Sequence, residues 1–403
     1  MLLSAWIGWF YFGASEMWGN SKSKLGIYDL SLLDIMSELP KTMKAVVFLG
    51  PYKVATVERE TPQLQKSTDV ILKVRYSGLC GTDLHSYRGH IKGTVNQIIG
   101  HEFLGTVVAK GNDVAEFELG DEVLSTFTIQ CGKCWYCKHG YSGQCDETNT
   151  FGKVGLDGGQ AEYVRIPYAS NTLIKKPSSL DDVDDSVYVM MADIFTTGYY
   201  GAIKIVNHFK NEATTQDISE ITVLQIGVGP VGLCAVRALK HFGFKKIVCV
   251  DNVPSRLAEA TKLGAFKTIN FDTEPDGVKK AIAEITHDVG FDAVLEVVGA
   301  TSALRTAYDS VRRNGYISSL GMGHEPLPFD GLECYLKNIN ISFGRCHAWS
   351  LFPEALEVFE KVKSDFANFI DCKISLEKSA EAFELFDQHK VNKVVFDLSE
   401  GCN

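Results

Sequence analysis

Apolar and polar positions alternate differently along three parts of the chain. From Met43 to about Pro177, short apolar runs are bounded by Gly, Pro and Asp, which is typical of a β-rich, barrel-like domain. Strands are expected at residues 43–48, 70–74, 105–108, 121–124 and 161–164. After Ser186 the apolar positions recur with helical spacing, and from Ile221 strand and helix patterns alternate.

The alternating part predicts a parallel sheet covered by helices. Strands are expected at 221–226, 246–250, 293–298 and 316–320, with helices at 233–242 and 255–263. Gly264 follows the second helix and predicts its C-cap. The polar stretch 208–220 is interpreted as an inserted surface loop. The predicted fold class is α/β, with a β-rich domain joined to a doubly wound parallel sheet.

The first 42 residues do not follow this pattern. Residues 2–14 are apolar and aromatic, but no basic residue precedes them and Glu16 ends the run. The run is too short to span a bilayer and lacks the positive start of a signal peptide. An extension outside the fold, a start codon assigned too early, a membrane-proximal anchor and a targeting peptide are all compatible with it.

Composition and charge narrow the classes of function. With 403 residues, of which 45% are hydrophobic, the chain can form two or three domains. A net charge of −10 argues against a nucleic-acid surface and against stable membrane binding through basic residues. Eleven cysteines without a disulfide framework favour a reducing compartment, for which we expect the cytoplasm.

Four cysteines close together predict a structural metal site. Two, two and seven residues separate Cys131, Cys134, Cys137 and Cys145. Four thiolates hold zinc tetrahedrally and leave no position for a substrate. The alternative is a group of buried or disulfide-bonded cysteines, but cysteines three residues apart are too close for disulfides of good geometry.

A glycine-rich turn predicts a dinucleotide site. The strand that ends at residue 226 is followed by Gly227, Gly229, Pro230, Val231 and Gly232. Strand, glycines, helix, second strand and terminal acid occur in the order that a dinucleotide fold requires. Gly227 permits the tight turn, Gly229 lets the backbone approach a pyrophosphate, and Gly232 allows close packing of helix and strand. The helix N-terminus attracts the phosphate charge.

Asp251 ends the second strand of this unit and predicts the type of cofactor. Its carboxylate would accept a hydrogen bond from a ribose 2′-hydroxyl and repel a 2′-phosphate, so NAD is expected rather than NADP. Arg256 follows five residues later and weakens that discrimination.

Two further motifs complete a family pattern. Cys80 opens the run Cys-Gly-Thr-Asp-Leu-His, and His101 and Glu102 follow Gly100. With the cysteines and glycines above, residues 43–398 resemble the zinc-dependent medium-chain alcohol dehydrogenases. Residues 158–168 and 192–199 resemble their formaldehyde-dehydrogenase-like branch. The residue pattern leaves 1–42 as an N-terminal extension. The resemblance implies a GroES-like catalytic domain over 43–194 and 345–403, and an NAD-binding Rossmann domain over 195–344.

The resemblance also implies a catalytic zinc site. Cys80, His101 and Asp193 match its ligands, with Glu102 as an alternate ligand and Asp83 as the acid that orients the histidine. Such a set leaves one position for a substrate oxygen, which zinc polarises as a Lewis acid. Taken singly, Cys80 could be a core residue and Asp193 a helix cap.

Further roles follow from the same resemblance. Thr82 would contact the substrate oxygen and His85 would pass its proton to water; a helix-capping Thr82 and an ordinary surface His85 are the alternatives. Phe127 matches a pocket wall, although core packing explains it nearly as well. The cofactor would contact Thr197, Val298, Leu320, Gly321, Met322 and Lys393, the last at its pyrophosphate.

The expected reaction is hydride transfer between NAD and an alcohol, polyol or aldehyde hydrate, with two zinc ions per chain. An aldehyde dismutase that keeps NAD bound is a second hypothesis, and a non-catalytic NAD-binding structural or regulatory protein is a third. The resemblance implies a homodimer or homotetramer. A small-molecule alcohol or aldehyde is the expected partner, and the residues do not choose among such substrates.

Overall fold

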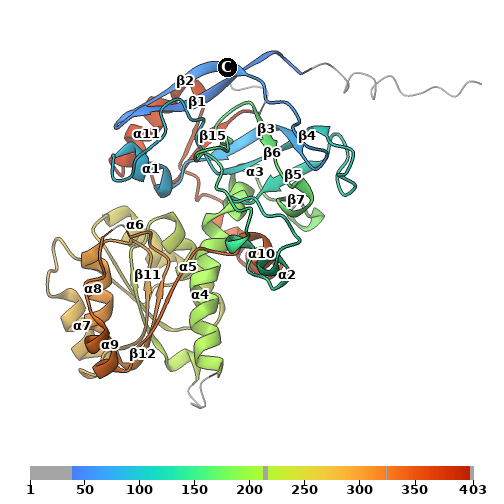
Figure 1. Cartoon of the computed structure of the whole chain (residues 1–403). Coiled ribbons are helices and arrows are strands. Elements are labelled where there is room, and N and C mark those ends of the chain that lie inside the picture. Colours follow the sequence, from blue (N-terminus) through green and yellow to red (C-terminus); the bar gives the residue numbers. More distant parts are fainter. Residues whose placement is uncertain (1–38, 212–216, 324, 400–403) are drawn as a thin grey trace, which may run out of the picture. The chain divides into compact units, whose positions relative to one another are not determined.

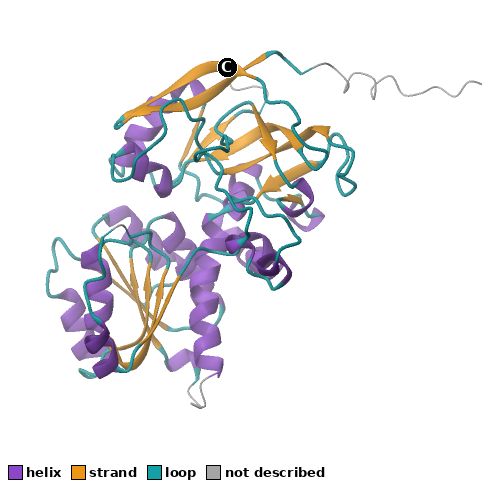
Figure 2. Ribbon diagram, viewed as in Figure 1, coloured by secondary structure: helices purple, strands orange, loops and turns teal. Residues whose placement is uncertain are grey.

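The computed structural model describes residues 39–211, 217–323 and 325–399. The apolar run near the N-terminus, and the interpretations attached to it, lie outside the described residues. No helix in the described part is long and apolar enough to cross a membrane. Two large sheets and one hairpin organise the fold, and helices flank the second sheet (Figure 1, Figure 2).

The first large sheet is mainly antiparallel and belongs to the β-rich part. Its strand order is β14-β15-β3-β4-β5-β7, and β6 pairs with β3. The strands are β3 (Val70–Gly78), β4 (Glu102–Lys110), β5 (Glu122–Ser125), β6 (Tyr163–Ile166), β7 (Leu173–Lys175), β14 (Cys372–Ile374) and β15 (Val394–Asp397). A hairpin of β1 (Thr42–Gly50) and β2 (Lys53–Glu60) forms a separate sheet. Because β15 pairs with β3, the C-terminal segment returns to the first part of the chain.

The second sheet has six parallel strands in the order β10-β9-β8-β11-β12-β13. They are β8 (Thr222–Ile226), β9 (Lys246–Asp251), β10 (Lys267–Asn270), β11 (Phe291–Glu296), β12 (Val311–Ser319) and β13 (Asn340–Phe343). The helices that alternate with them are α5 (Pro230–His241), α6 (Pro254–Leu263), α7 (Gly277–Thr286), α8 (Thr301–Ser310) and α9 (Gly331–Lys337). The order reverses at β8, which places a ligand site at the carboxyl ends of β8 and β11. The predicted fold class is confirmed.

One predicted loop is wrong at its start. Helix α4 (Ile194–Asn211) continues through His208 and Phe209, and a short 3₁₀ helix occupies Ile218–Glu220. The helix persists because Phe209 keeps its apolar face in the core, where only 5% of this side chain is exposed. The strand expected at 161–164 is likewise displaced to Tyr163–Ile166.

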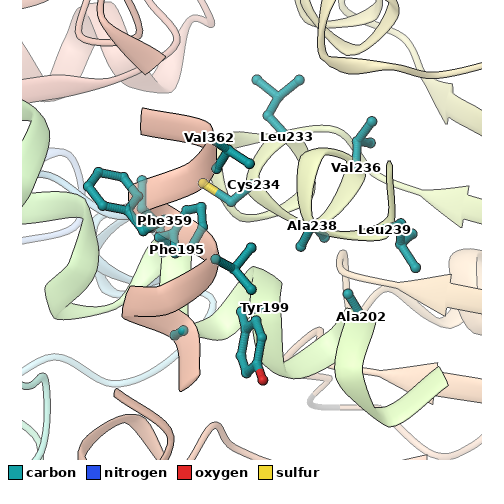
Figure 3. Close-up of a cluster of buried hydrophobic side chains, with 14 of the residues drawn as sticks. Phe195, Tyr199, Ala202, Leu233, Cys234, Val236, Ala238, Leu239, Phe359 and Val362 are labelled. Carbon is teal, nitrogen blue, oxygen red and sulfur yellow. The ribbon is translucent and has the colours of Figure 1, made fainter. Parts of the chain in front are cut away.

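The largest core cluster joins α4 to α5 and to α10 (Ala348–Val362). Figure 3 shows side chains of the three helices close together, with labels on Phe195, Tyr199 and Ala202 of α4, on Leu233, Cys234, Val236, Ala238 and Leu239 of α5, and on Phe359 and Val362 of α10. Burying a Phe or Leu side chain contributes about 1.5–3 kcal/mol each. This packing fixes the start of α4, which immediately follows Asp193.

Candidate metal and cofactor sites

Four side chains from distant parts of the sequence meet in the interior. Cys80 precedes α1 (Gly81–Tyr87), His101 and Glu102 lie at the start of β4, and Asp193 precedes α4. One potential ligand atom from each lies within 4.8 Å of the others, and all four residues are buried. We call Cys80, His101, Glu102 and Asp193 the core site.

The core-site side chains are held in place by further contacts. Asp193 Oδ2 lies 3.3 Å from His101 Nε2 and 3.7 Å from Cys80 Sγ. On the other side of the ring, Asp83 Oδ1 lies 3.4 Å from His101 Nδ1, and its second oxygen accepts the Cys80 N–H at 3.1 Å. The Thr197 hydroxyl donates to Asp193 Oδ1 at 2.7 Å. This thiol, imidazole and carboxylate set fits zinc, with Asp83 and Thr197 orienting two of the donors.

The pKa values of the core-site side chains show that the carboxylates there need a positive charge beside them. Burial raises the pKa of the Cys80 thiol. Burial alone would lower the pKa of His101, but the charges of Asp83 and Cys80 outweigh it and hold that pKa well above its usual value. Burial opposes ionisation of Asp193, yet His101 keeps its pKa low. A divalent cation would take over the charge that a protonated His101 supplies.

Lys393 lies against the core site. Its amine forms an ion pair with Glu102 and donates to the Leu79 carbonyl at 3.0 Å, and both charged side chains are 0% exposed. The return of β15 to β3 carries Lys393 inward, where a buried carboxylate requires a cation. The expected contact of Lys393 with a cofactor pyrophosphate stays a prediction. The second oxygen of Glu102 has no hydrogen-bond partner within the part of the chain that the structure describes.

The proposed proton route lies on α1, next to the core site. Thr82 and His85 are both half-buried and are three residues apart, so they are neighbours on the helix surface. Phe127 is buried with Cys346 and Ala348. The structure places these residues, but their roles toward a substrate stay predictions.

The four cysteines expected to form a structural site lie in one loop around the helix Trp135–Lys138. Their sulfur atoms also lie within 4.8 Å of one another, and all four are free thiols. We call Cys131, Cys134, Cys137 and Cys145 the loop site. Backbone amides donate to its sulfurs, as from Cys131 N–H to Cys145 Sγ at 3.2 Å and from Cys134 N–H to Cys131 Sγ at 3.4 Å.

These backbone amides change the pKa values of the loop-site thiols. Hydrogen bonds from the backbone of Asp146 and Cys137 lower the pKa of Cys134 to about 6. Burial and the neighbouring thiols raise the pKa of Cys137. Cys134 is thus the more readily ionised of these two thiols, and zinc would favour ionisation of all four. The donor set fits a closed zinc site.

The glycine-rich turn has the shape of a phosphate cradle. Gly227 has φ +90°, and a Cβ there would lie 2.6 Å from the Val298 side chain. A Cβ on Gly232 would lie 2.3 Å from the Gly227 carbonyl oxygen. Gly229 is open, since among the described residues other than its chain neighbours only Arg256 Nη1 comes within 4 Å of its Cβ position, at 3.9 Å. Pro230 then begins α5, with Val231 half-buried behind it.

Asp251 joins the end of β9 to this turn. Its carboxylate accepts hydrogen bonds from the backbone N–H groups of Val228, Asn252 and Val253, at 2.9, 2.8 and 3.0 Å. The residue is 7% exposed. A carboxylate has about four acceptor positions, so these bonds leave capacity for a ribose hydroxyl.

Two buried polar residues shape the turns after β8 and β11, and neither was expected from the sequence. Gln225 donates to the Gly227 and Gly232 carbonyls at 3.1 and 2.7 Å. Glu296 accepts the Val298 and Gly299 N–H groups, each at 2.6 Å, and the Ser319 hydroxyl at 2.8 Å. Each of the two is a polar residue in a mostly apolar strand, and this pattern could have indicated them.

The other residues expected near the nicotinamide gather at the same sheet edge. Val298 and Met322 are exposed there, and Leu320 is half-buried. A Cβ on Gly321 would lie 2.0 Å from the Gly299 nitrogen, so these two turns are in direct contact.

Comparisons with known proteins agree with this geometry. The model of the alcohol dehydrogenase GroES-like domain matches residues 66–178, and the model of the zinc-binding dehydrogenases matches residues 230–361. A zinc-type alcohol dehydrogenase B of Aspergillus flavus is 45% identical, covering 89% of this chain and 82% of its own length. A medium chain reductase/dehydrogenase of Acremonium sp is 43% identical, covering 73% of this chain and 99% of its own.

A solved structure supports the same assignment. The alcohol dehydrogenase of a Thermus species superposes with a TM-score of 0.78 at 31% identity, covering 88% of this chain and 99% of that one. With both family models matched and sequence identity of this extent, the chain belongs to the zinc-type medium-chain alcohol dehydrogenase family.

Proposed function

We propose that this protein is an NAD-linked alcohol dehydrogenase that holds two zinc ions per chain, one in the core site and one in the loop site. The observation that carries the proposal is the meeting of Cys80, His101 and Asp193 within 4.8 Å in the interior. Bound zinc would supply a Lewis acid for the substrate oxygen, and bound NAD a hydride acceptor. The substrate would be an alcohol, polyol or aldehyde hydrate, and the product an aldehyde or ketone.

The chain's own residues then position the donors and move a proton. Asp83 fixes the ring of His101, and Thr197 fixes the carboxylate of Asp193. Thr82 contacts the substrate hydroxyl, and His85 carries its proton toward water. The carboxylate of Asp193, where many relatives have a thiolate, supports a place in the formaldehyde-dehydrogenase-like branch.

Asp251 supports NAD as the preferred cofactor. Its carboxylate is fixed by three backbone amides at the end of β9, where a 2′-phosphate would meet a like charge.

We further propose a homodimer in the cytoplasm. Strand β13 is the last strand of its sheet, and Tyr335 and Leu336 on the preceding α9 are 79% and 69% exposed. An open strand edge beside apolar side chains is a site of association, and a second copy would cover both. The ten cysteines of the described residues are all free, which supports a reducing compartment.

A panel of alcohols, polyols, amino alcohols and S-hydroxymethyl thiols, assayed with NAD and with NADP, tests the proposal. We expect NADH formation with at least one class and weaker use of NADP. The amount of NAD that remains bound after purification separates a dehydrogenase from a dismutase. Bound zinc and NADH without turnover on any member of the panel would favour the non-catalytic hypothesis.

A further inference from the structure

His90 follows the end of α1 and returns to the helix beside His85. The backbone N–H of His90 donates to the His85 carbonyl at 2.9 Å, and that of Gly89 donates to the Ser86 carbonyl at 3.0 Å. Gly89 lies in the left-handed region, at φ +75°. These two bonds and the left-handed residue form a Schellman motif, in which the second residue past the helix cap lies against the last turn. The motif therefore brings His90 next to His85.

Contacts with other elements fix this end of α1. The N–H of Tyr52, in the turn of the β1–β2 hairpin, donates to the Tyr87 carbonyl at 2.7 Å. The rings of these two tyrosines meet edge to face, with their centroids 5.2 Å apart. The next residue, Arg88, forms an ion pair with Asp387 at 2.6 Å. The fold thus sets the separation of the two histidines, because the segment between them is held from two sides.

The two histidine rings occupy places that hydrophobic side chains frequently fill in this motif. Their centroids are 6.1 Å apart and their planes are inclined by 57°. One water molecule that forms a hydrogen bond of about 2.8 Å with each ring spans such a gap. Two imidazoles in place of an apolar contact favour proton exchange over packing as the role of the pair.

Exposure to solvent increases along α1 from the core site to His90. Asp83, which contacts His101, is 8% exposed. Thr82 and His85 are half-buried, and His90 is exposed. A proton that reaches His85 therefore has a second imidazole between it and bulk water.

We infer that His90 accepts the substrate proton from His85 and releases it to bulk water. The inference rests on the proposed function, because it extends the proton route of the same site. The proton leaves the substrate hydroxyl through Thr82 and His85, while the hydride carries its electron pair to the cofactor. His90 gains and loses only the proton. Imidazole suits this step because it takes up and releases protons near neutral pH.

The rate of proton release tests the inference, measured with a pH indicator in weakly buffered solution while the full chain oxidises an alcohol with NAD in a single turnover. His90→Asn should slow proton release roughly threefold to tenfold, less than the 10²- to 10⁴-fold of a positioned acid or base, because water still reaches the half-buried His85. Added imidazole buffer should restore the rate, since a dissolved carrier replaces the missing one. His287→Asn changes another exposed histidine and is the matched control, which should keep the unaltered rate.

A second variant separates proton transfer from packing. His90→Leu supplies the apolar side chain that this motif frequently has, but no proton carrier, so it should release the proton as slowly as His90→Asn. Proton release at the unaltered rate in either variant would overturn the inference. A slowing that stays the same at every imidazole concentration would also overturn it, because it would give His90 a structural role only. If the unaltered chain formed no NADH with any alcohol, the proposed function itself would fail, and the inference with it.

Discussion

The loop site and the core site each gather four potential metal ligands, by different routes. The loop site draws its ligands from residues 131–145, and backbone amides of the same segment donate to its sulfurs. The core site draws on residues 80–193, and each ligand depends on another element of the fold. Asp83 holds His101, Thr197 holds Asp193, and Lys393 pairs with Glu102.

Because their ligands are gathered differently, the two sites can have different functions. Four thiolates surround an ion completely, and their geometry is set by a short stretch of chain. The core site has mixed donors in the interior and contacts from both halves of the sequence. We therefore expect substitutions at the core site to affect turnover and folding together, whereas those at the loop site should leave the chemistry intact.

Asp193→Ala should have the largest effect. Without this carboxylate the core site loses a donor and we expect roughly a 10³-fold loss of kcat/KM, since metal polarisation contributes several kcal/mol. Asp193→Cys is the matched control and should still bind zinc. Zinc content and kinetics decide the result. Full zinc and a normal rate in Asp193→Ala, persisting when Glu102 is changed to Gln, would remove Asp193 from the active site.

Lys393→Met should lower the free energy of unfolding by about 3–5 kcal/mol, because it leaves Glu102 as an uncompensated buried charge. Burial raises the pKa of Glu102 and Lys393 opposes that shift. The deficit should therefore shrink as the pH falls and Glu102 takes up a proton.

Urea unfolding of the full chain measures this deficit. The double variant with Glu102→Gln should recover most of the loss, since it buries no unpaired charge. If Lys393→Met alone were as stable as the unaltered protein, the ion pair with Lys393 would not be what stabilises the buried Glu102.

His85→Gln should slow alcohol oxidation about tenfold near neutral pH, because the proton loses its carrier. The loss should be smaller at high pH, where hydroxide accepts the proton directly. A pH-rate profile of kcat is the measurement. An equal loss at every pH would mean that His85 has a structural role only.

Cys134→Ser should have the smallest effect on catalysis. It removes a thiolate from the loop site, so we expect loss of that zinc and a lower melting temperature. The change in kcat/KM should stay within about threefold, since the two sites share no ligand. If a folded Cys134→Ser protein kept the core-site zinc but lost most of its activity, the two sites would not be functionally separate.

Much of this organisation could be predicted from the sequence. The four cysteines lie within fifteen residues, so spacing alone predicts the loop site. The glycine-rich turn and Asp251 follow from local order in the same way. The doubly wound sheet could be predicted because its strands have patterns typical of buried strands. An example is β8 (Thr222–Ile226), in which all residues are buried.

The features that the sequence did not predict depend on tertiary packing. Lys393 has no local signal for its direction, because the pairing of β15 with β3 turns it inward onto a residue 291 positions earlier. The extra turn of α4 depends on the burial of Phe209 within a polar stretch. The role of Glu296 likewise depends on backbone amides that only the folded turn brings to it.

Zinc content, measured together with turnover on the same purified protein, tests the central claim most directly. Two separate donor sets of this kind predict close to two zinc ions per chain in fully active protein, with the core-site ion exchanging more readily than the loop-site ion. A value near one zinc per chain at full activity would contradict the assignment of two metal sites.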